Sequence, residues 1–132
     1  MNDPIADMLI RIKNAYRARH QTVVAPFSVL KAQIAKILEE EGCIKNVRLE
    51  QDQHKELRMD LKYHAGEIPF MADIKRVSKP GCRIYADKDH LPHMKKSFGF
   101  TIVSTSQGLM TGFEAKKKGV GGEIICNIFT AA

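Results

Sequence analysis

The sequence predicts an α+β fold of two small packed domains, and three observations favour this class. Two stretches within the first 42 residues carry apolar side chains at helical spacing, each behind a residue that can cap a helix. The rest of the chain has alternating apolar and polar residues and more glycine, which indicates strands and turns. The 132 residues suffice for two small domains, and such small halves need each other's support. We expect an N-terminal α-β-α-β-β domain over residues 1–66 and a C-terminal domain over residues 67–132, mostly antiparallel β with one short helix.

The first helix is expected to begin at Pro4, because proline fits the first helical position and Asp3 can cap it. An apolar stripe at helical spacing follows, formed by Ile5, Met8, Leu9, Ile12 and Tyr16. Between residues 11 and 19 the helix carries four cations and no acidic residue. These cations suit contact with phosphate, and they equally suit pairing with the helix dipole.

A short strand is expected over residues 22–25, ended by Pro26, and Ser28 then caps a second helix that ends before Gly42. The buried face of this helix is expected to be Leu30, Ile34, Ile37 and Leu38. Two strands come next, over residues 44–50 and 57–63, and the second alternates strictly between apolar and charged residues. The polar stretch 52–55 connects them as a hairpin, and residues 64–67 read as a linker.

The second domain is expected to consist mainly of strands. Residues 74–78 and 83–86 flank Pro80-Gly81, the signature of a type II turn, and so predict a hairpin with a cationic rim. The rim consists of Lys75, Arg76, Lys79 and Arg83. A strand over residues 98–103 then leads into a polar turn at 104–108.

One short helix precedes the last predicted strand. Thr111 and Glu114 have the spacing of a capping box, and Gly119 follows the expected end of the helix. Gly121 and Gly122 then open a strand that runs to Phe129.

The charge balance is basic, with 21 Lys and Arg against 15 Asp and Glu. Residues 1–66 contain 11 basic and 9 acidic residues, and residues 67–132 contain 10 basic and 6 acidic residues, so the basic excess is larger in the second half. Such an excess favours a polyanionic partner, most simply nucleic acid, or an anionic membrane surface. No apolar run approaches the roughly 20 residues that span a bilayer, and the N-terminus lacks a secretory signal pattern, so we expect a cytoplasmic protein.

The sequence favours neither a metal site nor a catalytic nucleophile. Cys43, Cys82 and Cys126 are odd in number and lack zinc-ligand spacing, so we expect three reduced thiols. His90 and His93 flank a proline, which makes helical ligand spacing improbable, and no arrangement typical of a nucleophilic enzyme is present. We therefore expect no cofactor and no enzymatic activity.

Two unusual segments offer chemistry for binding. Ser104-Thr105-Ser106 places three hydroxyls in a row, and hydroxyls both donate and accept, so they can bind base edges, ribose and phosphate. Residues 119–123 lead into a strand and are mostly glycine, which lets a nucleic acid approach the main chain. Glu123, the last of them, can accept a hydrogen bond from a base amino group. The alternatives are a turn in which the hydroxyls satisfy their own backbone, and a bulge or tight turn at the glycines.

Taken together, these segments resemble the bacterial small-subunit ribosomal protein eight family over almost the whole chain. The matching segments occur in the family's order and spacing, at residues 3–9, 39–42, 76–81 with 83–85, 104–106 with 108 and 110–111, and 121–126. The sequence departs from the usual family pattern at Val29, His90, His93, Gln107 and Gly112, and in the tail over residues 127–132.

The resemblance implies a structural protein with two packed α+β domains that binds an irregular helix in the central domain of small-subunit ribosomal RNA early in assembly. It implies recognition by Ser104, Thr105 and Ser106, with Gly121, Gly122 and Glu123 on the same surface and Tyr85 beside it. For backbone contacts from the N-terminal domain, the candidates are Asn14, Lys31 and Lys55. The resemblance also implies ribosomal protein five as a neighbour and, in some members, repression of a ribosomal-protein mRNA that mimics the RNA site.

Two other hypotheses compete with RNA binding. One is a small enzyme that uses a nucleotide or a metal near Gly121-Gly122 and His90/His93, which tight uptake of ATP or zinc would support. The other is a protein-interaction module whose basic surface serves solubility alone, which absent or salt-insensitive RNA binding would support.

Overall fold

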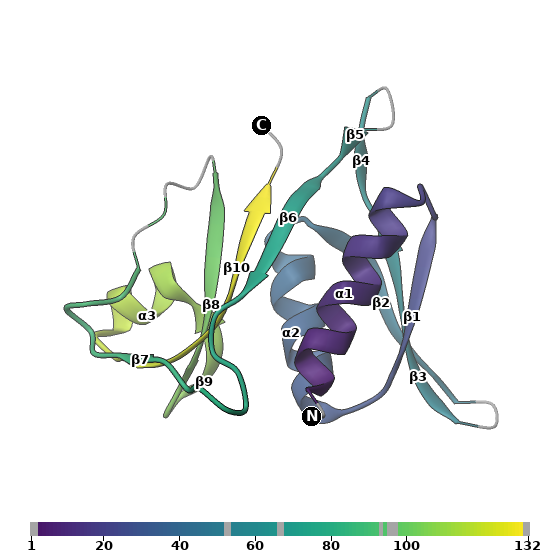
Figure 1. The fold of residues 1–132 in the computed structure, drawn as a ribbon. Coiled ribbons are helices and arrows are strands. Elements are labelled where there is room, and N and C mark those ends of the chain that lie inside the picture. The colour runs from purple at the N-terminus through teal and green to yellow at the C-terminus, as the bar shows by residue number, and fades with distance from the viewer. Residues whose placement is uncertain (1–2, 52–53, 66–67, 93, 95–97, 131–132) are drawn as a thin grey trace. The chain divides into compact units, whose positions relative to one another are not determined.

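The computed structural model describes residues 3–51, 54–65, 68–92, 94 and 98–130 (Figure 1). The chain divides into two compact units. The N-terminal unit comprises Pro4–Met71, and the C-terminal unit comprises Ala72–Thr130 together with Asp3 at the start of the chain. The predicted α+β class is confirmed, while the expected domain boundary between residues 66 and 67 stays a prediction.

The N-terminal unit begins with the predicted α-β-α-β-β order. Its elements are α1 (Pro4–Arg17), β1 (Thr22–Pro26), α2 (Val29–Glu40), β2 (Ile44–Gln51) and β3 (Lys55–Leu61). The strands form a sheet in the order β1-β3-β2, with both pairings antiparallel, and α1 and α2 lie on one side of it (Figure 1). None of the helices in the described part of the chain is long and apolar enough to cross a membrane.

The core of this unit is formed by the predicted apolar stripes, with one correction on α2. All five residues expected on α1 are buried, and so are Ile34, Ile37 and Leu38 on α2. Leu30 was wrongly placed in the core, since it is 40% exposed, whereas Lys31 is only 6% exposed. The buried stripe of α2 is centred on Lys31, Ile34 and Leu38, one turn apart, so Leu30 lies at its margin. The charge of Lys31 concealed this position in the sequence.

The end of α2 has the expected glycine cap. Gly42 has a φ of +82° and donates its N–H to Glu39 O, while the N–H of Cys43 donates to Leu38 O, which is the Schellman arrangement. The Tyr16 hydroxyl on α1 then donates to Cys43 O and accepts from the N–H of Lys62. A single buried hydroxyl thus joins α1 to the end of α2 and to the residue after β3.

His64, the first residue of the expected linker over residues 64–67, instead lies in a strand of a short hairpin. β4 (Tyr63–His64) pairs antiparallel with β5 (Ile68–Pro69), and the His64 ring stacks on Phe70 with centroids 4.9 Å apart. Two-residue strands are too short to produce a visible alternation, and this explains the error. Residues 66 and 67 of the expected linker, and residues 52 and 53 of the expected hairpin connection, lie outside the described residues.

The C-terminal unit is mostly strand, with one short helix, as predicted. Its elements are β6 (Met71–Arg76), β7 (Tyr85–Ala86), β8 (Gly99–Thr105), β9 (Gly108–Thr111), α3 (Gly112–Lys118) and β10 (Gly122–Thr130). The strand order is β6-β10-β8-β9, and β7 also pairs with β10. The helix begins and ends as the sequence indicates, because the Thr111 hydroxyl accepts from the N–H of Glu114 and Gly119 has a φ of +69°.

The expected hairpin between residues 74–78 and 83–86 is wrong beyond its turn. The turn itself is present, because Lys79 and Cys82 exchange both main-chain hydrogen bonds around Pro80-Gly81, at 3.0 and 2.9 Å. On either side, however, β6 and β7 pair with β10 and not with each other. The edge of β10 offers main-chain groups to both segments, and this pairing is non-local, so the turn signal could not reveal it.

Candidate nucleic-acid interface

Three of the predicted binding residues form one row across the C-terminal sheet. Glu123 on β10 lies directly opposite Tyr85 on β7 and directly opposite Ser104 on β8. Directly opposed residues of antiparallel strands present their side chains on the same face. Tyr85 is 69% exposed, and the other two residues are partly buried. This Tyr85–Glu123–Ser104 row therefore places an aromatic ring, a carboxylate and a hydroxyl side by side.

The three consecutive hydroxyls of the β8–β9 hairpin have different roles. Thr105 Oγ1 accepts from the N–H of Gln107 at 3.0 Å and donates to Gly108 O at 2.8 Å, so it closes the turn. Ser106 is exposed in the two-residue loop, and Ser104 lies on the row. Within the described ranges, neither serine hydroxyl has a hydrogen-bond partner. The alternative of a self-satisfied turn thus applies to Thr105, while the two serines remain available to a ligand.

Gly121 and Gly122 allow the strands around the row to approach closely. A Cβ atom on Gly122 would lie 2.1 Å from Ser104 O, and one on Gly121 would lie 2.4 Å from Ala86 O. Both distances are far below van der Waals contact, so no side chain fits at either position. Close strand packing thus explains the bare main chain at these two positions. The bulge in β10 occurs later, between Ile124 and Cys126.

The Glu123 carboxylate is held in place by two residues that the sequence did not single out for this role. Glu123 Oε2 accepts from Ser78 Oγ at 2.5 Å and from Arg83 Nη1 at 3.0 Å. Burial acts to raise the pKa of Glu123, but the hydrogen bonds from Ser78 and Arg83 outweigh it and hold the pKa below its ordinary value. The hydrogen bond to Glu123 in turn raises the pKa of Arg83. Glu123 is therefore an ionised acceptor at neutral pH.

Part of the predicted cationic rim serves internal contacts. Arg76 donates from Nε to Asp3 at 3.2 Å and from Nη1 to Ile125 O at 2.6 Å, and its side chain is only 11% exposed. Arg83 binds Glu123, and Lys75 Nζ lies 5.9 Å from the centroid of the Phe129 ring. Lys79 is exposed beside the Pro80-Gly81 turn. The rim thus consists of two cations that form ion pairs, the mostly buried Arg76 and the exposed Arg83, and of two exposed lysines.

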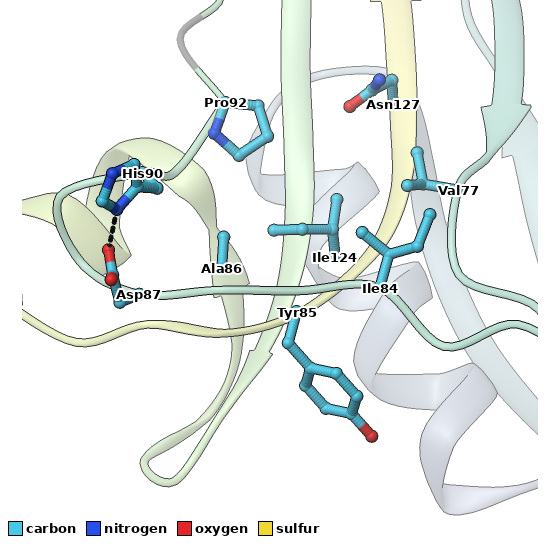
Figure 2. A pocket seen from close by; sticks show the side chains of 9 residues that line it. All are labelled: Val77, Ile84, Tyr85, Ala86, Asp87, His90, Pro92, Ile124 and Asn127. Carbon is cyan, nitrogen blue, oxygen red and sulfur yellow. Dashed lines mark hydrogen bonds and ion pairs between the residues drawn. The ribbon is translucent and has the colours of Figure 1, made fainter.

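A cavity of about 410 Å³ lies against the same strand β7. Its lining residues are Val77, Ile84, Tyr85, Ala86, Asp87, His90, Pro92, Ile124 and Asn127. Figure 2 shows the Tyr85 ring pointing away from the other lining side chains, so the exposed ring belongs to the row rather than to the cavity. A second, shallower hollow of about 560 Å³ lies between residues 85–88 and the glycines 119, 121 and 122.

The histidine considered as a metal ligand pairs with a carboxylate. His90 Nδ1 lies 2.6 Å from Asp87 Oδ1, and this hydrogen bond lowers the pKa of Asp87. The described residues contain no group of three His, Cys, Asp or Glu side chains that could hold a metal. His93, the other candidate, lies outside them.

The candidates of the N-terminal unit lie on three different elements. Asn14 is exposed on α1, and Lys55 is exposed at the start of β3 with its Nζ 5.9 Å from the centroid of the Phe27 ring. Lys31 is buried on α2 and is therefore the least suited of the three to contact a phosphate from the surface. The role of all three residues in RNA binding stays a prediction.

Comparisons with known proteins agree with the resemblance drawn from the motifs. The family model described as ribosomal protein S8 matches residues 3–129. The small ribosomal subunit protein uS8 of Acidobacterium capsulatum is 45% identical over 130 residues, 98% of each chain. The uS8 proteins of Pelagibacter ubique and Neisseria meningitidis are each 48% identical, over 98% and 96% of this chain and of the relative. The chain therefore belongs to the ribosomal protein S8 family.

Proposed function

We propose that this protein binds directly to the central domain of small-subunit ribosomal RNA, at an irregular helix, and helps to assemble the platform of the subunit. Family membership makes it a structural, non-enzymatic protein of the small ribosomal subunit, associated with the RNA and proteins of that subunit in the cytoplasm. The finer assignment rests on one observation. The Tyr85–Glu123–Ser104 row joins an exposed ring, an ionised acceptor and a hydroxyl without a hydrogen-bond partner among the described residues, on three adjacent strands.

The chemistry of this row suits irregular RNA. A regular A-form helix keeps its bases stacked and their major-groove edges in a deep and narrow groove, whereas an irregular helix exposes bases to stacking and hydrogen bonding. The Tyr85 ring can stack on such a base, and the carboxylate of Glu123 can accept from a base amino group. The hydroxyls of Ser104 and Ser106 can donate to or accept from bases, ribose and phosphate.

Cations near the row supply contacts to the RNA backbone. Lys79 and Lys88 are exposed on either side of β7, and Lys116–Lys118 are exposed at the end of α3. Each lysine that neutralises a phosphate releases counterions and makes the affinity depend on salt. In the N-terminal unit, the exposed Asn14 and Lys55 are the candidates for further backbone contacts, and the buried Lys31 ranks below them.

Two finer parts of the proposal concern partners. We assign ribosomal protein five as a neighbour in the subunit, on the strength of the family resemblance. We also propose that a ribosomal-protein mRNA carrying the same irregular helix competes for this site, because the row recognises local shape rather than a long sequence. An mRNA fragment with that helix should displace the ribosomal RNA fragment in a competition assay, and failure to displace it would remove the repressor role.

The direct test is a titration with two RNAs at two salt concentrations. One RNA carries the irregular central-domain helix, and the other has its internal loop replaced by regular base pairs. We expect a strong preference for the irregular RNA. In the Ser106→Ala variant, the loss of one hydrogen bond of about 1–3 kcal/mol weakens binding about five- to 150-fold.

A matched control separates recognition from general effects of substitution. Gln33 is exposed on α2, and Gln33→Ala removes a surface polar group that belongs to the N-terminal unit and not to the C-terminal sheet. Its affinity should equal that of the wild type. Equal and strongly salt-dependent binding of the wild type to both RNAs would mean that the basic charge attracts RNA without recognising its shape, and would overturn the proposal.

A further inference from the structure

Ser78 is a fully buried polar residue beside the proposed RNA surface. It lies between β6 and the Pro80-Gly81 turn, and its exposed fraction is 0%. A serine in such surroundings needs hydrogen bonds, since an unpaired buried hydroxyl destabilises the fold. Ser78 cannot contact RNA directly, because its side chain does not reach the surface.

The hydroxyl of Ser78 joins two parts of the row. It donates to Glu123 Oε2 at 2.5 Å, and it accepts from the N–H of Ile84 at 3.1 Å. The N–H of Ser78 in turn donates to Ile124 O at 3.0 Å. One residue therefore connects the start of the turn, the residue before Tyr85 and the side chain of Glu123.

This connection limits the freedom of Tyr85. Strand β7 has only two residues, and Tyr85 is the first of them. Ile84, just before it, is fixed at both main-chain groups, since its N–H donates to Ser78 Oγ and its carbonyl accepts from the N–H of Ile124 at 2.9 Å. Without the hydroxyl, one of these two attachments disappears, and the segment carrying the ring is held more loosely.

The connection also holds the carboxylate of Glu123. Its two donors are Ser78, which is buried, and Arg83, whose side chain is 48% exposed. An exposed guanidinium is free to turn toward a phosphate when RNA binds, whereas the buried hydroxyl stays in place. Ser78 is thus the donor that keeps the carboxylate oriented in both the free and the bound protein.

We infer that Ser78 is a positioning residue for RNA recognition, which sets the ring of Tyr85 and the carboxylate of Glu123 without touching the RNA. This inference rests on the proposed function. It predicts that removing the hydroxyl lowers affinity for the irregular helix through a loss of preorganisation. The number of phosphate contacts, and hence the salt dependence of binding, stays the same.

The sheet offers a closely matched control in Thr101. Thr101 is buried on β8, 3% exposed, and its hydroxyl donates to Asn127 Oδ1 at 2.7 Å. Thr101→Val removes a buried hydroxyl from the same sheet but not from the row. Both Ser78→Ala and Thr101→Val are expected to destabilise the fold, so binding is measured well below the unfolding midpoint of each variant.

The first measurement needs no RNA. The side-chain carboxyl carbon of Glu123 is titrated with pH by NMR in the intact protein. In Ser78→Ala the pKa of Glu123 should rise, because a hydrogen bond that favours the ionised form is lost while burial remains. It should stay unchanged in Thr101→Val. An unchanged titration of Glu123 in Ser78→Ala would show that the hydroxyl does not hold the carboxylate and would overturn the inference.

The second measurement is the titration with irregular and regular RNA. We expect Ser78→Ala to bind the irregular RNA about tenfold more weakly, with its affinity for the regular RNA and its salt slope unchanged. Thr101→Val should change neither affinity by more than about twofold. Equal losses in the two variants would assign the effect to general destabilisation, against a positioning role.

The inference stays testable if the wild type does not prefer the irregular RNA, and also if Ser78→Ala does not fold. If the wild type shows no preference for the irregular RNA, the proposed function fails, while the NMR titration still decides whether Ser78 holds Glu123. If Ser78→Ala does not fold, Ser78→Cys retains a weak donor at the same position and should give intermediate values of both readouts. In that case, wild-type values of both readouts for Ser78→Cys would refute the role of the hydroxyl.

Discussion

Replacing Tyr16 by phenylalanine isolates one buried hydroxyl in the N-terminal unit. The ring is 3% exposed and packs in the core, and its hydroxyl donates to Cys43 O and accepts from the N–H of Lys62. Tyr16→Phe keeps the ring and removes both hydrogen bonds. Two main-chain groups, one from the Schellman turn after α2 and one from the residue after β3, then lose this partner.

The cost follows from the burial of the first hydrogen bond and the partial burial of the second. A buried polar group left without a partner destabilises the fold by about 1–3 kcal/mol, and losing the part-buried hydrogen bond adds about 1 kcal/mol, so we expect a total of about 2–4 kcal/mol. This is a large part of the roughly 5–15 kcal/mol by which a typical domain is stable. With a urea dependence of about 1–3 kcal/mol/M, the unfolding midpoint should fall by about 1–2 M.

Urea unfolding followed by far-UV circular dichroism measures this shift, and Tyr63→Phe is its control. The Tyr63 hydroxyl donates to His20 O at 2.6 Å, but this hydrogen bond is exposed, so water can replace the lost partner. Its removal should cost less than about 1 kcal/mol. Equal midpoints for the two variants would refute the argument that burial of the Tyr16 hydrogen bonds is what stabilises the unit.

Three other predictions concern the C-terminal unit. Gly122→Ala should destabilise the fold by about 3 kcal/mol, because the new Cβ would lie 2.1 Å from Ser104 O; Gly112→Ala, with its nearest atom 3.6 Å away, should be tolerated, and thermal unfolding compares the two. The lowered pKa of Glu123 means that its ionised form stabilises the fold fully above its ordinary pKa of 4.5, and that this contribution is lost as pH falls through the lowered pKa. The stability difference between wild type and Glu123→Gln should therefore be constant near neutrality and shrink in acid; urea titrations from about pH 7 to about pH 3 that show no such change would contradict this. Lys79→Gln should reduce the slope of log affinity for the irregular RNA against log salt by about 0.7–0.9, and an unchanged slope would exclude Lys79 from the phosphate contacts.

Much of the fold is encoded in local signals, and these could be predicted. Ser28 and Thr111 cap the helices that follow them, and Gly42 and Gly119 end those helices with positive φ angles. Each signal acts within about one turn of the backbone, so neighbouring residues in the sequence suffice to reveal it. The strict alternation in β3 is similarly local, and Leu57, Met59 and Leu61 are buried as expected.

The parts that could not be predicted depend on contacts between distant residues. Strands β6 and β7 both bind β10, although their sequence suggested that they pair with each other across the Pro80-Gly81 turn. The missed strand β9 has four residues, and it forms because β8 offers an edge to it. Pairing of this kind depends on which edges the rest of the sheet leaves open, which no local pattern contains.

In the candidate site, too, some features could be predicted from the sequence and others depend on contacts between distant residues. The motif resemblance pointed to the residues of the row, and the register of β7, β8 and β10 places Tyr85, Glu123 and Ser104 side by side. The contribution of Ser78 was not foreseen, since its hydrogen bond to Glu123 joins residues 45 positions apart. The sequence placed it at the end of the expected strand over residues 74–78, and burial was the property that singled it out.

The position of β10 in the sheet also has a consequence for synthesis of the chain on the ribosome. β10 follows every other strand of its sheet in the sequence, yet it lies between β6 and β8. All strands of the N-terminal sheet precede residue 72, so this sheet can pair its strands before the second half of the chain has been synthesised. In the C-terminal sheet, by contrast, β6 and β8 keep unpaired edges until residues 122–130 have been synthesised. The growing chain is thus most prone to mispairing and aggregation between the synthesis of β8 and that of β10. This period ends when β10 pairs with β6 on one side and β8 on the other.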